Sequence, residues 1–159
     1  MSYQSFACSP KAWIFKRQDP KINDADLELI LVMTESRANQ LWQDYVSKAH
    51  LHPDHFDATD WLKNPAQQLA LVSWEKRWES NEMSLPAEVL LHLEHWGDDT
   101  RIYFGYNSDE VFETSWGVFQ RSWKNFLFFD NGPVLLGKKK QQAVQFFSDG
   151  KCQLLNRSV

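Results

Sequence analysis

The fold class is indicated by a segment near the C-terminus that spans residues 134–155 and reads VLLGKKKQQAVQFFSDGKCQLL. Its apolar runs are as short as typical strands, and turn-forming residues separate them. The three runs are residues 134–136, 143–147 and 152–155. Asp149 and Gly150 form a favoured hairpin pair, because both residues tolerate positive φ. The segment therefore predicts consecutive antiparallel strands.

Two more strands and one helix are predicted just before this segment. Aromatic and β-branched residues indicate strands at 102–106 and 126–129. Between them, Phe112, Trp116, Phe119 and Trp123 recur at helical spacing. This spacing predicts a helix over residues 115–124, although Gly117 disfavours it.

The first two thirds of the chain have mainly helical periodicity. The clearest apolar stripe predicts a helix over residues 35–49, in which Thr34 caps the first turn. The stripe consists of Ala38, Leu41, Trp42, Tyr45, Val46 and Ala49. The other expected elements are a strand at 12–15, helices at 24–32, 67–80 and 86–96, and a long loop at 50–65.

The order of these elements predicts an α+β fold, in which N-terminal helices pack on one face of a mainly C-terminal antiparallel sheet. Strands and helices do not alternate regularly, and the glycine-rich phosphate-binding motifs are missing from the sequence. Parallel nucleotide-binding folds are therefore disfavoured. The length of 159 residues suits one domain, residues 1–159.

Charge and cysteine content limit the possible partners and the location of the protein. The formal net charge is −4, so we expect no nucleic-acid partner. No apolar run is long enough to cross a membrane, and no secretion signal is evident. Cys8 and Cys152 are expected to be free thiols, which fits a reducing cytoplasm.

All five histidines fall in two clusters, which makes them the candidate metal ligands. The clusters are His50, His52 and His55 in the predicted loop, and His92 and His95 on a predicted helix. Imidazoles are common zinc ligands, so one hypothesis is that Zn²⁺ bridges the clusters. The alternative is that all five are solvated or boundary residues and that the protein has no cofactor.

Tryptophan is abundant, with eight residues in the chain. Most should be buried, but exposed ones would form a binding surface. The candidates are Trp61, Trp74 and Trp78, which lie beside the loop and have acidic neighbours. The acidic residues Asp54, Asp57 and Asp60 are interpreted as solvated surface charge, and the lysines at 138–140 as a solvated turn. No catalytic residue is assigned, because no nucleophile or acid–base motif is recognisable.

Several stretches together resemble a family of small bacterial proteins known only as a domain of unknown function. They are residues 13–15 (WIF), 33–38 (MTESRA), 41–42 (LW), 123, 126–133 (FLFFDNGP) and 145–150 (QFFSDG). The resemblance spans nearly the whole chain and implies a bacterial intracellular protein without a defined activity. In size and element order, the chain is also similar to small α+β immunity proteins, which neutralise toxins by binding them.

These observations favour a cytoplasmic protein-binding module with an unknown protein partner, and no enzymatic role. The alternative is a metal-dependent hydrolase that uses the two histidine clusters.

Overall fold

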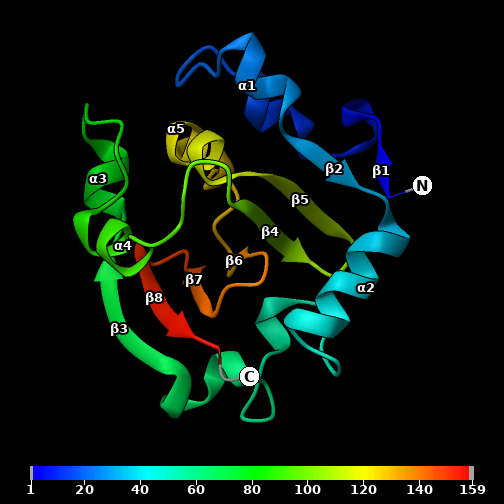
Figure 1. The fold of residues 1–159 in the computed structure, drawn as a ribbon, viewed down its shortest axis with the longest axis vertical. Coiled ribbons are helices and arrows are strands. Elements are labelled where there is room, and N and C mark those ends of the chain that lie inside the picture. Colours follow the sequence, from blue (N-terminus) through cyan, green and yellow to red (C-terminus); the bar gives the residue numbers. More distant parts are fainter. Residues whose placement is uncertain (1, 158–159) are drawn as a thin grey trace.

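The computed structural model describes residues 2–157, which form helices and an eight-stranded antiparallel sheet (Figure 1). The strand order across the sheet is β1-β2-β5-β4-β6-β7-β8-β3. The strands are β1 (Tyr3–Gln4), β2 (Leu31–Met33), β3 (Gln68–Ser73), β4 (Arg101–Asn107), β5 (Glu110–Ser115), β6 (Val134–Gly137), β7 (Gln142–Phe146) and β8 (Lys151–Asn156). The C-terminal part of the chain therefore supplies the centre of the sheet, and the N-terminal part supplies both edges.

The helices lie mainly between these strands. The α-helices are α1 (Asp24–Glu28), α2 (Glu35–Tyr45), α3 (Glu75–Glu79), α4 (Ala87–His92) and α5 (Trp116–Phe126). The short 3-10 helices are η1 (Phe6–Cys8), η2 (Ala12–Lys16), η3 (Pro53–His55), η4 (Trp61–Lys63) and η5 (Pro65–Gln67).

The strands predicted from the C-terminal segment are confirmed as β6, β7 and β8, and the strand predicted at 102–106 is confirmed as β4. The hairpin between β7 and β8 has Gly150 at a φ of +85°, while Asp149 keeps a negative φ. The amide of Gly150 donates to the carbonyl of Phe147. The connection is therefore a three-residue loop that ends in a left-handed glycine.

Three predicted helices are confirmed, with shifted ends. Thr34 caps α2 by accepting from the amide of Arg37, but α2 ends at Tyr45 rather than at residue 49. The amphipathic pattern near residue 120 is α5, which Ser115 caps by accepting from the amide of Val118. The helix expected at 86–96 is the shorter α4.

Four other predictions are wrong, wholly or in part. The helix expected at 67–80 is edge strand β3 followed by the short helix α3. The residues expected to form a strand at 12–15 form the 3-10 helix η2. Residues 126–129, also expected to form a strand, are instead the end of α5 and the turn after it. The helix at 24–32 ends at Glu28, because the next residues form β2 and pair with β5.

Buried side chains cover both faces of the sheet, whereas the sequence predicted helices on one face. Ile102 and Phe104 of β4 belong to the same apolar cluster as residues of α4, α5 and η2. Tyr103, which points to the opposite face, belongs to a second cluster with residues of α2. Figure 1 shows α2 and α5 on opposite sides of the β4–β5 pair.

The two cysteines do not form a disulfide. Cys8 is exposed, while Cys152 is buried in the cluster on the α5 face. Burial raises the pKa of the Cys152 thiol to about 12, so this group stays protonated at neutral pH. Among residues 2–157, no helix has the length and apolar character needed to span a bilayer.

An ion pair connects α1 to α5. Arg121 donates to both carboxylate oxygens of Asp26, over 2.8 and 2.9 Å. The Asp26 side chain is buried, whereas that of Arg121 is 57% exposed. These hydrogen bonds from Arg121 lower the pKa of Asp26 below its usual value of 3.8. Ionised Asp26 is therefore favoured by folding.

We expect Asp26→Asn to lower the free energy of unfolding by about 1–2 kcal/mol at neutral pH. The loss is modest because water screens the charge of the exposed Arg121 side chain. Since the pKa is depressed in the folded state, this contribution is present above the unfolded-state pKa and disappears as the pH falls through the folded value. Urea unfolding of both proteins at pH 7 and below about pH 3 measures the difference. A stability difference that stays constant in acid would contradict this account.

Candidate functional site

The two predicted histidine clusters do not combine into one metal site. His92 donates from Nε2 to the carbonyl of Leu155 over 2.9 Å, so its imidazole is used to hold α4 on β8. The side chain of His95 is 81% exposed, and its Nε2 atom lies 3.6 Å from the carboxylate of Glu94. Among residues 2–157, no three histidines bring ligand atoms within 4.8 Å of one another. Within the described residues, the structure therefore does not bring the two histidine clusters together around one ion.

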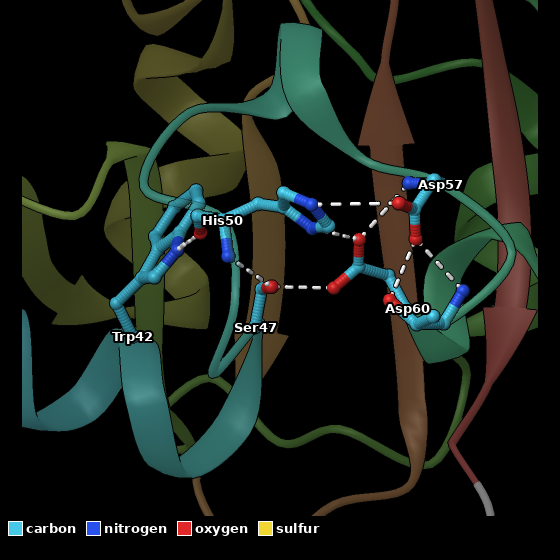
Figure 2. A network of polar contacts seen from close by, with 6 residues as sticks. Trp42, Ser47, His50, Asp57 and Asp60 are labelled. Carbon is cyan, nitrogen blue, oxygen red and sulfur yellow. Dashed lines mark hydrogen bonds and ion pairs between the residues drawn. The ribbon is translucent and has the colours of Figure 1, made fainter.

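One of the predicted histidines does lie in a polar network, which Figure 2 shows in the loop between α2 and β3. The Nδ1 atom of His50 is 2.7 Å from Oδ2 of Asp60. Ser47 donates its hydroxyl to the other oxygen of Asp60, and the amide of Asp57 donates to Oδ2 over 3.0 Å. Asp60 is only 5% exposed, so its interpretation as solvated surface charge is wrong.

The same network is attached to the core through Trp42. The indole nitrogen of Trp42 donates to the carbonyl of His50 over 2.7 Å, and the amide of His50 donates to the hydroxyl of Ser47. Trp42 is completely buried and stacks on Phe56 at a ring distance of 5.9 Å. The start of the loop is therefore held by the core on the α2 face.

Asp57 lies on the other side of the imidazole and is exposed. Its Oδ2 atom is 3.5 Å from Nε2 of His50, which is too long for a hydrogen bond of ordinary strength. Its Oδ1 atom accepts from the amide and the hydroxyl of Thr59, over 2.8 and 2.6 Å. These hydrogen bonds, together with the nearby His50, lower the pKa of Asp57.

The other two loop histidines are not part of this network. His52 accepts from the amide of Asp54 through Nδ1, and its ring is 6.3 Å from that of His55. His55 is exposed. Only His50 of the first cluster therefore has a buried carboxylate partner.

The three candidate tryptophans have different surroundings. Trp74 is 4% exposed and donates to the carbonyl of Lys151, so the structure excludes it from the binding surface. Trp61 and Trp78 are half-buried. The sequence does not single out Trp13, which is 51% exposed, because its short apolar run predicts a strand.

Trp78 borders a hollow of about 530 Å³ that has charges of both signs on its walls. The hollow is lined by Arg17, Asp19, Pro20, Trp78, Glu79, Ser80, Asn81, Met83, Lys124 and Phe128. The indole nitrogen of Trp78 donates to the carbonyl of Lys124, and the ammonium of Lys124 donates to the carbonyl of Ser80. Burial lowers the pKa of Lys124. These polar groups are used to join α3 to α5.

Trp61 lies beside a strongly basic pocket of about 600 Å³, although the sequence suggested acidic neighbours for it. Arg157 connects the two, because its guanidinium is 6.0 Å from the ring of Trp61 and 4.9 Å from the ring of Tyr45. The pocket, which we call the basic pocket, is lined by Arg37, Asp44, Tyr45, Tyr103, Leu136, Gly137, Lys138, Lys139, Lys140, Gln141 and Arg157.

Within the part of the chain that the structure describes, the cations of the basic pocket form no ion pairs with carboxylates. Arg37 and the lysines at 138–140 make no ion pair within residues 2–157, and the three lysines are exposed. Asp44 is the acidic residue in the lining, and its carboxylate accepts from Gln40. Burial raises the pKa of Tyr103, so its hydroxyl remains a hydrogen-bond donor at neutral pH.

Sequence reasoning noticed the three lysines but not the pocket. Arg37 is on α2, the lysines form the turn between β6 and β7, and Arg157 follows β8. These segments are far apart in the sequence and meet only because β6, β7 and β8 are neighbours under α2. No local motif could have indicated the pocket.

The fold and the pocket define an α+β protein with an antiparallel sheet and a basic surface site beside a half-buried tryptophan. The chain belongs to the family described as Protein of unknown function (DUF2947), whose model matches residues 3–154. The resemblance to a domain of unknown function is therefore confirmed. No curated protein and no solved structure matches the chain significantly.

Proposed function

We propose that this chain is a non-catalytic binding protein that takes an acidic segment of a partner protein into the basic pocket. The observation that carries the proposal is a group of five cations around one carboxylate that form no ion pairs among residues 2–157, in a protein whose net charge is −4. Like charges that are held together repel one another, and a carboxylate-bearing ligand removes this repulsion.

The aromatic residues beside the pocket favour a protein partner. Tyr45 and Trp61 lie against Arg157. Tyrosine, tryptophan and arginine are the residue types that contribute most to protein interfaces, because they bury a large area and still form polar contacts. Trp61 is held in place by a hydrogen bond from its indole nitrogen to the carbonyl of Tyr45 over 3.0 Å. The partner therefore meets a preformed surface.

A nucleic acid fits this surface less well. Nucleic-acid affinity depends on many phosphate contacts along an extended basic stripe, and here the cations are confined to one hollow of about 600 Å³. The negative net charge of the whole chain also repels a long polyanion. A short acidic segment needs only the pocket.

Fluorescence anisotropy with a labelled oligoglutamate peptide tests the proposal. We expect the peptide to bind, and we expect Lys138→Gln combined with Lys140→Gln to weaken binding about tenfold at low salt. The matched control is Lys21→Gln combined with Lys76→Gln, which removes the same charge from exposed positions outside the pocket. The control should bind like the wild type.

Two results would overturn the proposal. One is equal weakening by both double variants, which would mean that the peptide responds only to total charge. The other is tighter binding of a single-stranded oligonucleotide than of the peptide at the same salt concentration, which would indicate a different class of partner.

A further inference from the structure

The polar network around His50 has a feature that the basic pocket does not explain. Among residues 2–157, His50, Asp57 and Asp60 are the one group of three potential metal ligands whose donor atoms lie within 4.8 Å of one another. Figure 2 shows both carboxylates turned toward the imidazole. The two carboxylates carry a combined charge of −2, which a divalent cation would neutralise.

Asp60 orients the imidazole and is not itself free to bind a metal. Its oxygens already accept hydrogen bonds from Ser47 and from the amide of Asp57. A carboxylate can only accept, so the 2.7 Å contact places a proton on Nδ1 of His50 and leaves Nε2 as the nitrogen that can bind a metal ion in the neutral ring. A carboxylate that accepts from the far nitrogen of the ring is a usual partner of a metal-binding histidine, because it fixes the tautomer and raises the basicity of the other nitrogen.

Asp57 presents the second donor atom at a suitable distance. Two ligands that are each about 2.0–2.1 Å from a tetrahedral Zn²⁺ lie about 3.4 Å apart. Oδ2 of Asp57 and Nε2 of His50 are 3.5 Å apart. Because Thr59 holds the other oxygen of Asp57 with two hydrogen bonds, Oδ2 is directed at the imidazole before any ion binds.

A neighbouring pair shows what is special about this arrangement. His52 and Asp54 are also 3.5 Å apart, and Asp54 is as exposed as Asp57, with side-chain exposures of 57% and 56%. However, Nδ1 of His52 already accepts the amide of Asp54, and its ring has no buried carboxylate partner. The distance and the exposure of the aspartate are therefore matched in the two pairs, which differ in the orienting carboxylate and in the ring nitrogen that His52 already uses as an acceptor.

We propose that His50 Nε2 and Asp57 Oδ2 bind one Zn²⁺ or a similar transition-metal ion, with water completing the coordination and Asp60 as the orienting residue. Water ligands are expected because the His50 side chain is 22% exposed and that of Asp57 is 56% exposed. The proposal does not depend on the basic pocket.

Isothermal titration of the full chain with Zn²⁺ alone tests this site. We expect one ion to bind per chain, and we expect Asp57→Asn to weaken binding at least about tenfold. Asparagine keeps an oxygen for the Thr59 hydrogen bonds, so the loop should remain folded. Asp54→Asn makes the same change in the matched pair and should leave the affinity unchanged.

A second variant and a second measurement make the result independent of any one substitution. His50→Gln removes the nitrogen ligand and should also weaken binding at least about tenfold. Added Zn²⁺ should raise the Tm of the wild type and of Asp54→Asn, but not of Asp57→Asn or His50→Gln. Absence of saturable binding to the wild type, or equal losses in Asp54→Asn and Asp57→Asn, would overturn the proposal.

Discussion

Trp42→Ala is expected to lower the free energy of unfolding by about 3–5 kcal/mol, the range for removing a large aromatic side chain from a core. Trp42 is completely buried and packs directly against the backbone of β4, where a Cβ on Gly105 would be 3.1 Å from the indole ring. The substitution leaves a cavity between α2 and the sheet. It also leaves the carbonyl of His50 without its indole donor.

Urea unfolding followed by circular dichroism measures this loss. Trp13→Ala is the control, because it removes the same side chain from a position that is 51% exposed, and we expect a change below about 1 kcal/mol. Similar losses in the two variants would mean that Trp42 does not connect α2 to the sheet in the way described.

Asp60→Ala is expected to lower the free energy of unfolding by about 2–3 kcal/mol. Three donors lose their acceptor in this variant, namely the hydroxyl of Ser47, Nδ1 of His50 and the amide of Asp57. Asp60 is also the residue before η4, which begins at Trp61. The loop should therefore become more sensitive to proteolysis as well as less stable.

Asp57→Ala is the matched control for Asp60→Ala, because both carboxylates face the same imidazole. Asp57 is exposed and makes its hydrogen bonds to Thr59, so we expect only a small effect on unfolding. Urea unfolding and limited proteolysis of the two variants compare them directly. If Asp57→Ala lowered the free energy of unfolding as much as Asp60→Ala, the hydrogen bonds to Asp60 would not be what stabilises the loop.

The elements that could be predicted from sequence are those whose stability comes from local signals. Helix α2 has both a capping threonine and a continuous apolar stripe, and the C-terminal strands are separated by clear turn residues. The sequence predicts a helix in place of strand β3 because Leu71, Trp74 and Trp78 have helical spacing. Its conformation is decided by pairing with β8, which the local sequence does not reveal.

The candidate sites also contain some residues that a local sequence pattern reveals and others that only the folded chain brings together. His50 was noticed because histidines cluster in the sequence, but its partner Asp60 looked like one of several surface acids. What distinguishes Asp60 from Asp57 is burial, and burial depends on how the loop folds back on α2. The basic pocket was missed for a related reason, because Arg37 and Arg157 meet only in the folded chain.

The placement of N-terminal strands at both edges of the sheet affects how the protein can fold during translation. β2 pairs with β1 and with β5, and β3 pairs with β8. The ribosome releases β2 and β3 before β5 and β8 have been made. Until then, their apolar residues lack the partners that bury them in the finished sheet, and such waiting segments are exposed to aggregation. The nascent chain thus completes this sheet only after β8 has been made.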